Sequence, residues 1–288
     1  TPDNERKGLP TYLEAFPYVN GGLFRQRHSA PEFSRKSRQL IIEAGELDWK
    51  GINPDIFGSM FQGVIDPGKR GSLGAHYTSV PNIMKVIEPL FLDELYEAYE
   101  KAKGNTKKIS ELLHRLSQIK IFDPACGSGN FLIIAYKELR RLEMKIFREN
   151  NMMAFSQISL SQFYGIELDD FAHEIAQLSL WLAEHQMNVE FFKQFGRTNP
   201  TLPLKEAGKI VCGNACRIKW EEVCTHANNE TYILGNPPYL GAHLQDSIQK
   251  EDMKIVFEGK TKYKNLDYIA AWFYKASKYI ENKSSSFS

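Results

Sequence analysis

Residues 119–132 read Ile119-Lys120-Ile121-Phe122-Asp123-Pro124-Ala125-Cys126-Gly127-Ser128-Gly129-Asn130-Phe131-Leu132, and this stretch decides the fold. Its first four residues are rich in β-forming side chains, and apolar residues recur from Phe131 to Phe147 at the spacing of one helical face. Between them, Gly127 and Gly129 let the backbone turn sharply and approach a ligand that a side chain would obstruct. We therefore predict a strand ending at Asp123, a glycine turn, and a helix whose first amide groups can bind a polar ligand.

The same alternation of strand and helix continues along the chain. The expected elements are helices at 81–103 and 109–116, strands at 162–166, 209–212 and 231–234, and a final helix at 267–280. Strands alternating with helices of this length predict an α/β fold with a doubly wound, mostly parallel sheet. Because such sheets bind ligands at the carboxyl ends of their strands, those ends are where we expect the chemistry.

Two regions are expected. Residues 1–72 contain scattered Pro and Gly and short helical stretches at 35–44 and 54–64, which predicts a smaller helical connector. Residues 73–288 hold the strand–helix series, and the chain ends in a serine-rich run where a further strand would begin. We therefore expect a core whose sheet is incomplete at its C-terminus. Because the first residue is Thr1 and not Met, we expect a piece of a longer protein.

Composition sets only broad limits. The chain has 288 residues, 42% of them hydrophobic and 25% charged, with a mean hydropathy of −0.40. No apolar run approaches the roughly 20 residues of a membrane span, and no secretory signal opens the chain, so we expect a cytoplasmic protein without a membrane partner. The net charge of +1 means that any contact with nucleic acid must rest on local patches.

The cysteines leave two interpretations open. Cys212, Cys216 and Cys224, with His226 nearby, could be imagined as a zinc site, but their spacing matches none of the usual paired-cysteine patterns. We expect reduced thiols in the core, and no metal.

The strand at 162–166 leads into an acidic residue, Glu167. A carboxylate at such a strand end can accept hydrogen bonds from both ribose hydroxyls of a bound nucleoside. The alternative, an acid in the first turn of the next helix, fits Asp169 and Asp170 better than Glu167. That helix carries apolar residues on one side, at Phe171, Ile175, Leu178 and Leu182.

The last predicted strand leads into Gly235-Asn236-Pro237-Pro238-Tyr239. A stiff proline turn with no chemical role is one interpretation. The other is a site for an aromatic amine, whose lone pair is delocalised and nucleophilically weak. The Asn236 amide oxygen and the Pro237 carbonyl could accept hydrogen bonds from that amine, held in place by the rigid prolines. Tyr239 offers a flat face for stacking the base.

These motifs resemble those of a known family. The proline turn is similar to the Asn-Pro-Pro-Tyr motif of amino-methyltransferases, and residues 123–132 resemble their cofactor motif. Leu73–Ser79 is similar to the segment that covers the methionine end of that cofactor. The order of the motifs resembles gamma-class DNA adenine methyltransferases, and the stretches Pro17–Phe24 and Gly165–Gln186 resemble the MmeI-like fused restriction–modification enzymes.

The resemblance implies a Rossmann-like methyltransferase core that binds S-adenosylmethionine and transfers its methyl group to the exocyclic amino group of adenine in DNA. Asn236, Pro237, Pro238 and Tyr239 would receive an adenine flipped out of double-stranded DNA. In place of an often acidic residue near the cofactor's adenine, this chain has Asn214. The cofactor pocket would comprise Tyr77, Thr78, Asp123, Ala125, Gly127, Gly129, Asn130, Phe131, Glu167, Leu168 and Asn214.

The family also implies a target recognition domain C-terminal to this segment and a nuclease N-terminal to it. Three rival functions stay open: methylation of protein glutamine or RNA, a truncated module that binds cofactor without turnover, and a dinucleotide-dependent oxidoreductase. The last is disfavoured because Leu132 stands where the third glycine of the dinucleotide fingerprint would fall.

Overall fold

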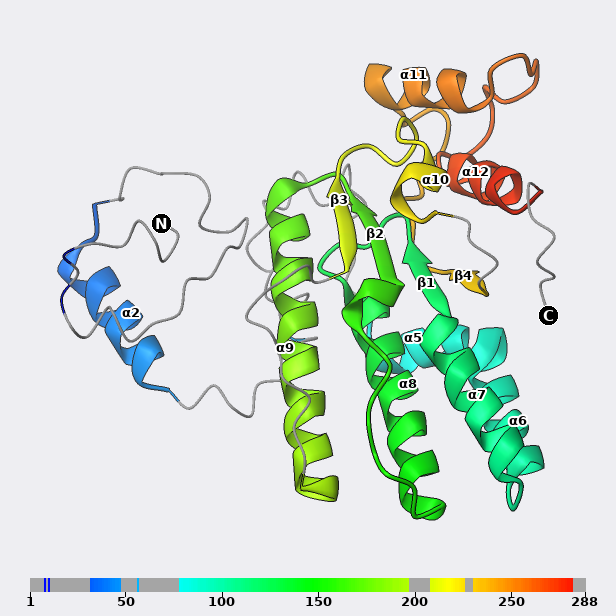
Figure 1. The fold of residues 1–288 in the computed structure, drawn as a ribbon. Coiled ribbons are helices and arrows are strands. Elements are labelled where there is room, and N and C mark those ends of the chain that lie inside the picture. The colour runs from blue at the N-terminus through cyan, green and yellow to red at the C-terminus, as the bar shows by residue number, and fades with distance from the viewer. Residues whose placement is uncertain are drawn as a thin grey trace.

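In this computed structural model the described residues are 32–47, 78–196, 208–225 and 230–281, together with Gly8, Pro10 and Ile56. Four parallel strands form one sheet in the order β3-β2-β1-β4 (Figure 1). The strands are β1 (Lys120–Asp123), β2 (Phe163–Glu167), β3 (Lys209–Cys212) and β4 (Thr231–Ile233). The predicted α/β fold with a doubly wound parallel sheet is thereby confirmed.

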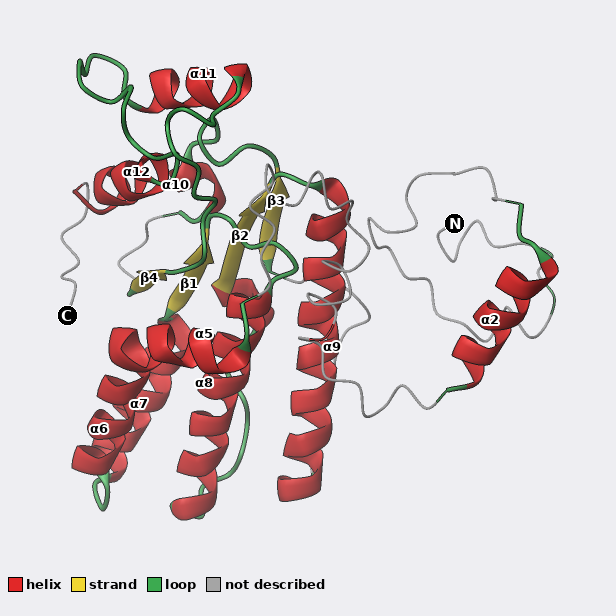
Figure 2. Ribbon diagram, turned by 180° about the vertical axis from the view of Figure 1, so that it is seen from behind, coloured by secondary structure: helices red, strands yellow, loops and turns green. Residues whose placement is uncertain are grey.

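Helices cover both faces of this sheet (Figure 2). One layer contains α5 (Val80–Ile87), η4 (Glu88–Leu92), α6 (Asp93–Ala102), α7 (Thr106–Gln118), α8 (Asn130–Glu149) and α9 (Asp170–Phe195); the other contains α10 (Trp220–Val223), α11 (Ser247–Val256) and α12 (Ala270–Glu281). Successive side chains of a strand point to opposite faces. Ile121 accordingly lies in the buried cluster of the first layer, and Phe122 lies in that of the second.

The helix predicted at 81–103 is continuous but not uniform. Its middle turn, η4, is a π-helical turn in which the N–H of Asp93 bonds to the carbonyl of Glu88. Pro89 lies inside this turn and has no N–H to donate, so a widened turn replaces a regular one there. The next helix, α7, runs longer than the predicted 109–116, because Asn105 caps its start by accepting from the Lys108 N–H at 3.1 Å.

The buried side of α9 differs from the one that its large residues suggest. Phe171 is exposed, and Ile175, Leu178 and Leu182 are only partly buried. The buried positions are Ala172, Ala176, Ser179, Leu180, Ala183, Met187, Asn188 and Phe191. Small residues allow close packing: a side chain at Gly129, where α8 starts, would lie only 3.2 Å from the Ala176 Cβ.

The N-terminal region contributes one described helix, α2 (Arg35–Glu46), which confirms the helix predicted at 35–44. None of the residues of α2 is buried. The helix predicted at 54–64 and the stretch Pro17–Phe24 lie outside the described residues. No helix in the described ranges has both the length and the apolar character that crossing a membrane requires.

One buried amide joins the first strand to the helix before it. Gln162, which ends the short 3-10 turn η5 (Leu160–Gln162), donates from Nε2 to the carbonyls of Leu116 at 2.9 Å and Ile119 at 2.8 Å. Both carbonyls lie at the point where α7 turns into β1, so this amide fixes how β1 enters the sheet.

Replacing Gln162 by Met tests this join. The change keeps the apolar stem but leaves two buried carbonyl oxygens without their donor, so the free energy of unfolding should fall by about 1–3 kcal/mol in denaturant titrations. Gln118→Met is the matched control, because Gln118 is exposed, and it should change stability by less than about 0.5 kcal/mol. Equal losses in the two variants would contradict the assigned role.

Candidate active site

The carboxyl ends of all four strands meet at one edge of the sheet. β1 ends at Asp123, β2 at Glu167 and β3 at Cys212, and the N–H of Leu234 continues the β4 pairing by donating to the Phe122 carbonyl at 3.0 Å. The strand order reverses direction at β1, with β2 on one side and β4 on the other. Open α/β sheets bind their ligands at such a switch point.

The glycine turn is held from the neighbouring strand. Gly127 and Gly129 have φ values of 54° and 85°, which other residues rarely adopt. Glu167 Oε2 accepts the Gly127 N–H at 2.8 Å, and Oε1 accepts the Asp169 N–H at 2.9 Å. Burial raises the pKa of Glu167, and these two hydrogen bonds oppose that rise. Glu167 therefore sets the shape of the turn after β1.

The helix-start role belongs to a different residue. Asp169 caps α9 by accepting the Ala172 N–H at 2.8 Å, and Asp170 stands in the first turn. Glu167 therefore does not act as the cap of this helix. Leu168, between these acids, is exposed at the same edge, whereas the Phe131 side chain is buried in the core and leaves only its backbone to a ligand.

A buried carboxylate lies at the centre of the edge. Asp123 is 1% exposed, and its Oδ1 accepts the Ala125 N–H at 3.0 Å. Oδ2 has no hydrogen-bond partner among the described residues, and the same holds for the buried Oδ1 of Asn130. Burial raises the pKa of Asp123 to about 8, and the nearby charge of Glu167 adds to the rise.

These features fit the expected cofactor. Two buried oxygen atoms, without partners among the described residues, lie beside a glycine turn in which the space next to Gly127 is open, and a ligand with amino and hydroxyl donors would satisfy them. Ala125 is partly buried in the same loop. These acceptor oxygens therefore suit the amino and hydroxyl groups of S-adenosylmethionine.

Asn214 follows β3, as expected, but its amide is engaged within the protein. Nδ2 donates to Asp252 Oδ2 at 2.8 Å, and Oδ1 accepts the Cys216 N–H at 2.8 Å. Its expected place near the cofactor's adenine stays a prediction.

The proline turn reaches across to the segment before α5. Asn236 is exposed and donates from Nδ2 to Thr78 Oγ1 at 3.3 Å, which leaves its carbonyl oxygen as the acceptor of the amide. Pro237 and Pro238 are partly buried, and Tyr239 is 56% exposed. Tyr77 lies outside the described residues. The structure thus joins two motifs that are 158 residues apart in the chain.

A tight approach between β4 and β1 fixes where this turn begins. Gly235 has a φ of 146°, and a Cβ at this position would clash with Asp123 Oδ1 and lie 2.8 Å from its Cγ. Only a residue without a side chain fits between the carboxylate and the proline turn.

Sequence reasoning missed the residues that support these loops. Trp272 donates from Nε1 to the Pro124 carbonyl at 3.0 Å, and Asp267 Oδ1 accepts the Leu240 N–H at 2.9 Å. Both lie where the sequence showed only the start of a helix. A polar Asp directly before an aromatic helix start is the one signal that could have indicated them.

The four cysteines are all free thiols. Cys212 is exposed, Cys216 and Cys224 are buried, and within the described residues no three His, Cys, Asp or Glu side chains are grouped as metal ligands would be; His226 lies outside them.

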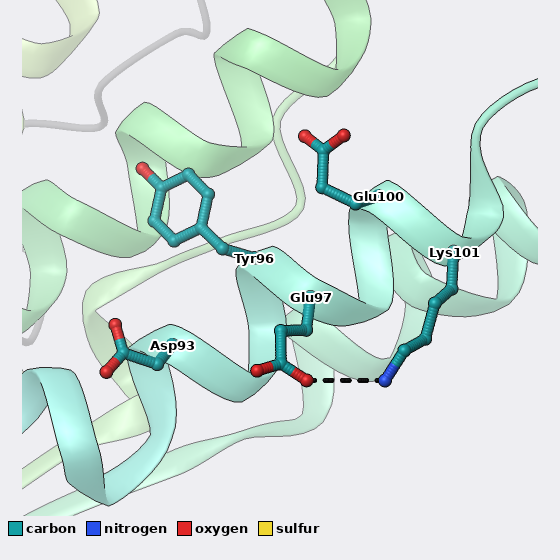
Figure 3. Close-up of a pocket in the computed structure, with 5 residues that line it drawn as sticks. All are labelled: Asp93, Tyr96, Glu97, Glu100 and Lys101. Carbon is teal, nitrogen blue, oxygen red and sulfur yellow. Dashed lines mark hydrogen bonds and ion pairs between the residues drawn. The ribbon is translucent and has the colours of Figure 1, made fainter.

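Figure 3 shows a pocket formed by α6 alone, in which Glu97 pairs with Lys101 at 3.3 Å. Figure 1 shows α6 below the sheet, away from the edge described here.

The Asp123 carboxyl should make stability depend on pH. A folded-state pKa raised from 3.8 to about 8 means that the folded protein binds this proton more tightly than the unfolded chain. Stability should therefore fall as pH rises through that interval, by at most about 1.4 kcal/mol per pH unit. Asp123→Asn has no such titration, so without added cofactor its unfolding free energy should fall less over the same interval.

The matched control is Asp93→Asn, because Asp93 is exposed. Its pH profile should run parallel to that of the wild type. A parallel profile for Asp123→Asn as well would show that Asp123 keeps an ordinary pKa.

Comparisons with known proteins bear on the family and the fold of this chain. Residues 99–288 match the family model described as the DNA-methyltransferase domain of MmeI. DNA methyltransferase A of Bacillus subtilis (strain 168) is 55% identical over 285 residues, which cover 96% of this chain and 32% of that protein. A putative type II restriction enzyme and methyltransferase of Methanocaldococcus jannaschii is 32% identical over 289 residues, covering 82% of this chain and 24% of that protein.

Among solved structures, the Type IIL restriction–modification enzyme MmeI in complex with DNA matches with a TM-score of 0.87 and 42% identity. The match covers 99% of this chain and 39% of that one. The chain thus spans between about a quarter and two fifths of the length of these proteins. Its sequence and its fold agree in one assignment: this chain belongs to the family of the MmeI DNA-methyltransferase domain.

Proposed function

We propose that this chain is the catalytic core of a DNA adenine methyltransferase in a fused restriction–modification enzyme. The observation that carries the proposal is the contact between Asn236 and Thr78. It brings the proline turn against the segment expected to cover the cofactor, at the sheet edge that holds Asp123 and Glu167. A methyl donor and an aromatic amine bound at these two places would be neighbours.

The residues that would bind the cofactor lie at the carboxyl ends of β1 and β2. The Asp123 and Asn130 oxygens that lack partners would accept hydrogen bonds from polar groups of the ligand, and Glu167 would bind its ribose while holding Gly127. Leu168 would pack against its apolar surface. When bound, S-adenosylmethionine supplies a methyl group on a sulfonium sulfur, which keeps the electron pair of the broken bond.

The residues that would bind the target amine lie in the proline turn. Because Asn236 Nδ2 donates to Thr78, Asn236 Oδ1 is oriented as an acceptor, and the Pro237 carbonyl would be the second acceptor. Together they would draw the amine nitrogen toward a tetrahedral geometry, so that its lone pair can form the new bond and a proton can leave. Tyr239 is exposed and would stack on the flipped base.

The relatives support the choice of partner. The MmeI structure is a complex with DNA, and the Methanocaldococcus jannaschii protein is named as both restriction enzyme and methyltransferase. We propose that residues 1–72 connect a nuclease to the core at 73–288, and that a target recognition domain follows. Double-stranded DNA with a flipped adenine is the proposed substrate.

The first test is transfer of labelled methyl from S-adenosylmethionine to duplex DNA by the full-length protein. Asn236→Ala should lower the single-turnover rate by about 100-fold or more, because it removes an acceptor for charge that develops in the transition state. Cofactor affinity, measured by calorimetry, should barely change. Tyr239→Ala should weaken binding of the flipped base and also lower the rate of methyl transfer. Tyr239→Phe should have only a small effect on both, because the aromatic ring remains.

Gln118→Ala is the control, because Gln118 is an exposed amide at the end of α7, at the opposite end of β1 from the site. If Asn236→Ala transfers methyl as fast as Gln118→Ala does, the proline turn is only structural. Digestion of the product identifies the base: label on cytosine, or only on protein or RNA, would overturn the adenine assignment.

The second test concerns the loop between α11 and α12. Lys260, Lys262 and Lys264 are exposed there, and the loop is held by parallel stacking of Phe257 on Tyr263, with ring centroids 5.7 Å apart. Lys254, on α11, is instead paired with Glu251 at 3.4 Å. We propose that the three loop lysines contact DNA phosphates; a solvated loop is the alternative.

Replacing these three lysines by Gln should flatten the salt dependence of DNA binding. The logarithm of the affinity falls linearly with the logarithm of the salt concentration, and each lost phosphate contact makes that slope less steep by about 0.9. The control replaces Lys101, Lys107 and Lys108, which are exposed on α6 and α7. Identical slopes for the two triple variants would exclude the loop from the DNA interface.

A further inference from the structure

A buried carboxylate lies on α11, outside the motifs used so far. Asp252 is 1% exposed, and both of its oxygens accept hydrogen bonds. Arg217 Nε donates to Oδ1 at 2.6 Å, and Asn214 Nδ2 and the Tyr268 hydroxyl each donate to Oδ2 at 2.8 Å. The positive charge of Arg217 also balances the negative charge of Asp252. A buried polar network in which every member is satisfied is rigid, and loss of one donor loosens it.

Through Asn214 and Tyr268, Asp252 is connected to loops that leave opposite edges of the sheet. Asn214 follows β3. Tyr268 holds Leu240, the residue directly after the proline turn, by donating its backbone N–H to the Leu240 carbonyl at 2.9 Å. Asp267 Oδ1 accepts the Leu240 N–H at 2.9 Å, so both backbone groups of Leu240 are fixed. Because β3 and β4 are the outer strands, no sheet hydrogen bond joins them, and the contacts around Asp252 connect their ends.

Two further residues of α12 fasten the remaining loops. Trp272 Nε1 donates to the Pro124 carbonyl after β1 at 3.0 Å, and the Tyr268 ring packs edge-on against Trp272 with centroids 5.2 Å apart. Lys275 Nζ donates to the carbonyls of Ala215 and Ile218, each at 2.6 Å. The loops after β1, β3 and β4 are therefore held by one short segment of chain.

We propose that Asp252 and Tyr268 are positioning residues for methyl transfer, which fix the proline turn relative to the loop after β3. The inference rests on the proposed function, because it takes the cofactor to lie at the strand ends near Asn214 and the amine at Asn236. In-line transfer depends closely on geometry, and a displacement of about 1 Å can cost about 100-fold in rate. A bridge between the two outer strand ends sets this separation without touching either ligand.

Tyr268→Phe in the full-length protein is the test variant. It removes the hydroxyl that bonds to Asp252 but keeps the ring against Trp272 and the backbone N–H that bonds to Leu240. Tyr279→Phe is the matched control: Tyr279 is a buried tyrosine of α12 whose hydroxyl donates to the Cys224 carbonyl at 2.9 Å. Each variant loses one buried phenol donor, so their losses of unfolding free energy should be similar, about 1 kcal/mol.

Two readouts separate positioning from stability. Hydrogen–deuterium exchange of the peptide spanning 236–245, measured without DNA, should be faster in Tyr268→Phe than in Tyr279→Phe. Single-turnover methyl transfer should be about tenfold slower in Tyr268→Phe, with DNA and cofactor affinities unchanged, while Tyr279→Phe keeps the wild-type rate.

Equal exchange at 236–245 and equal transfer rates in the two variants would overturn the inference. Failure of the proposed function gives a different result, because the wild-type protein then transfers no methyl to DNA. In that case the exchange comparison still decides whether the Asp252–Tyr268 contact holds the proline turn.

Discussion

The site depends on the way β4 closes against β1. The hydrogen bond from the Leu234 N–H to the Phe122 carbonyl extends the pairing of β4 with β1 by one residue. It places Gly235 in close contact with the buried carboxyl group of Asp123. That contact fixes where the proline turn leaves the sheet. It also removes the Asp123 carboxylate from water, which accounts for the raised pKa of this carboxyl group. The proposed cofactor side and the proposed amine side of the candidate site therefore share one boundary, formed by Gly235 and Asp123.

Most of the scaffold was predictable because its signals are local. Strands appear as short apolar runs that end at Asp123 and Glu167, and glycines mark the turn that follows β1. The site residues at strand ends follow from parallel topology alone, since carboxyl ends of parallel strands share an edge. Asp169 as the start of α9 was equally readable, because a cap is set by the chain within three residues of it.

What could not be predicted depends on contacts between distant parts of the chain. The face that α9 buries is set by close packing at Ala176 against Gly129, which favours small residues over the larger Phe171. Asn214 was expected to lie near the cofactor, but its bond to Asp252 was not predictable, because Asp252 is 38 positions away on α11. The contacts that Asp267 and Trp272 make with these loops could not be predicted either. Their partners are backbone atoms that come near only when the chain folds.

Residues 267–275 contact all three loops, and this determines how the core can be divided. A fragment ending soon after the proline turn would contain the four described strands and every recognised motif. It would nevertheless leave the carbonyls of Pro124, Ala215 and Leu240 without the donors that come from 268–275. For fusion or domain exchange, the junction therefore belongs beyond Glu281, where α12 ends, and not at the last motif. In this fold the smallest part that keeps these loops in place is longer than the part that contains the motifs.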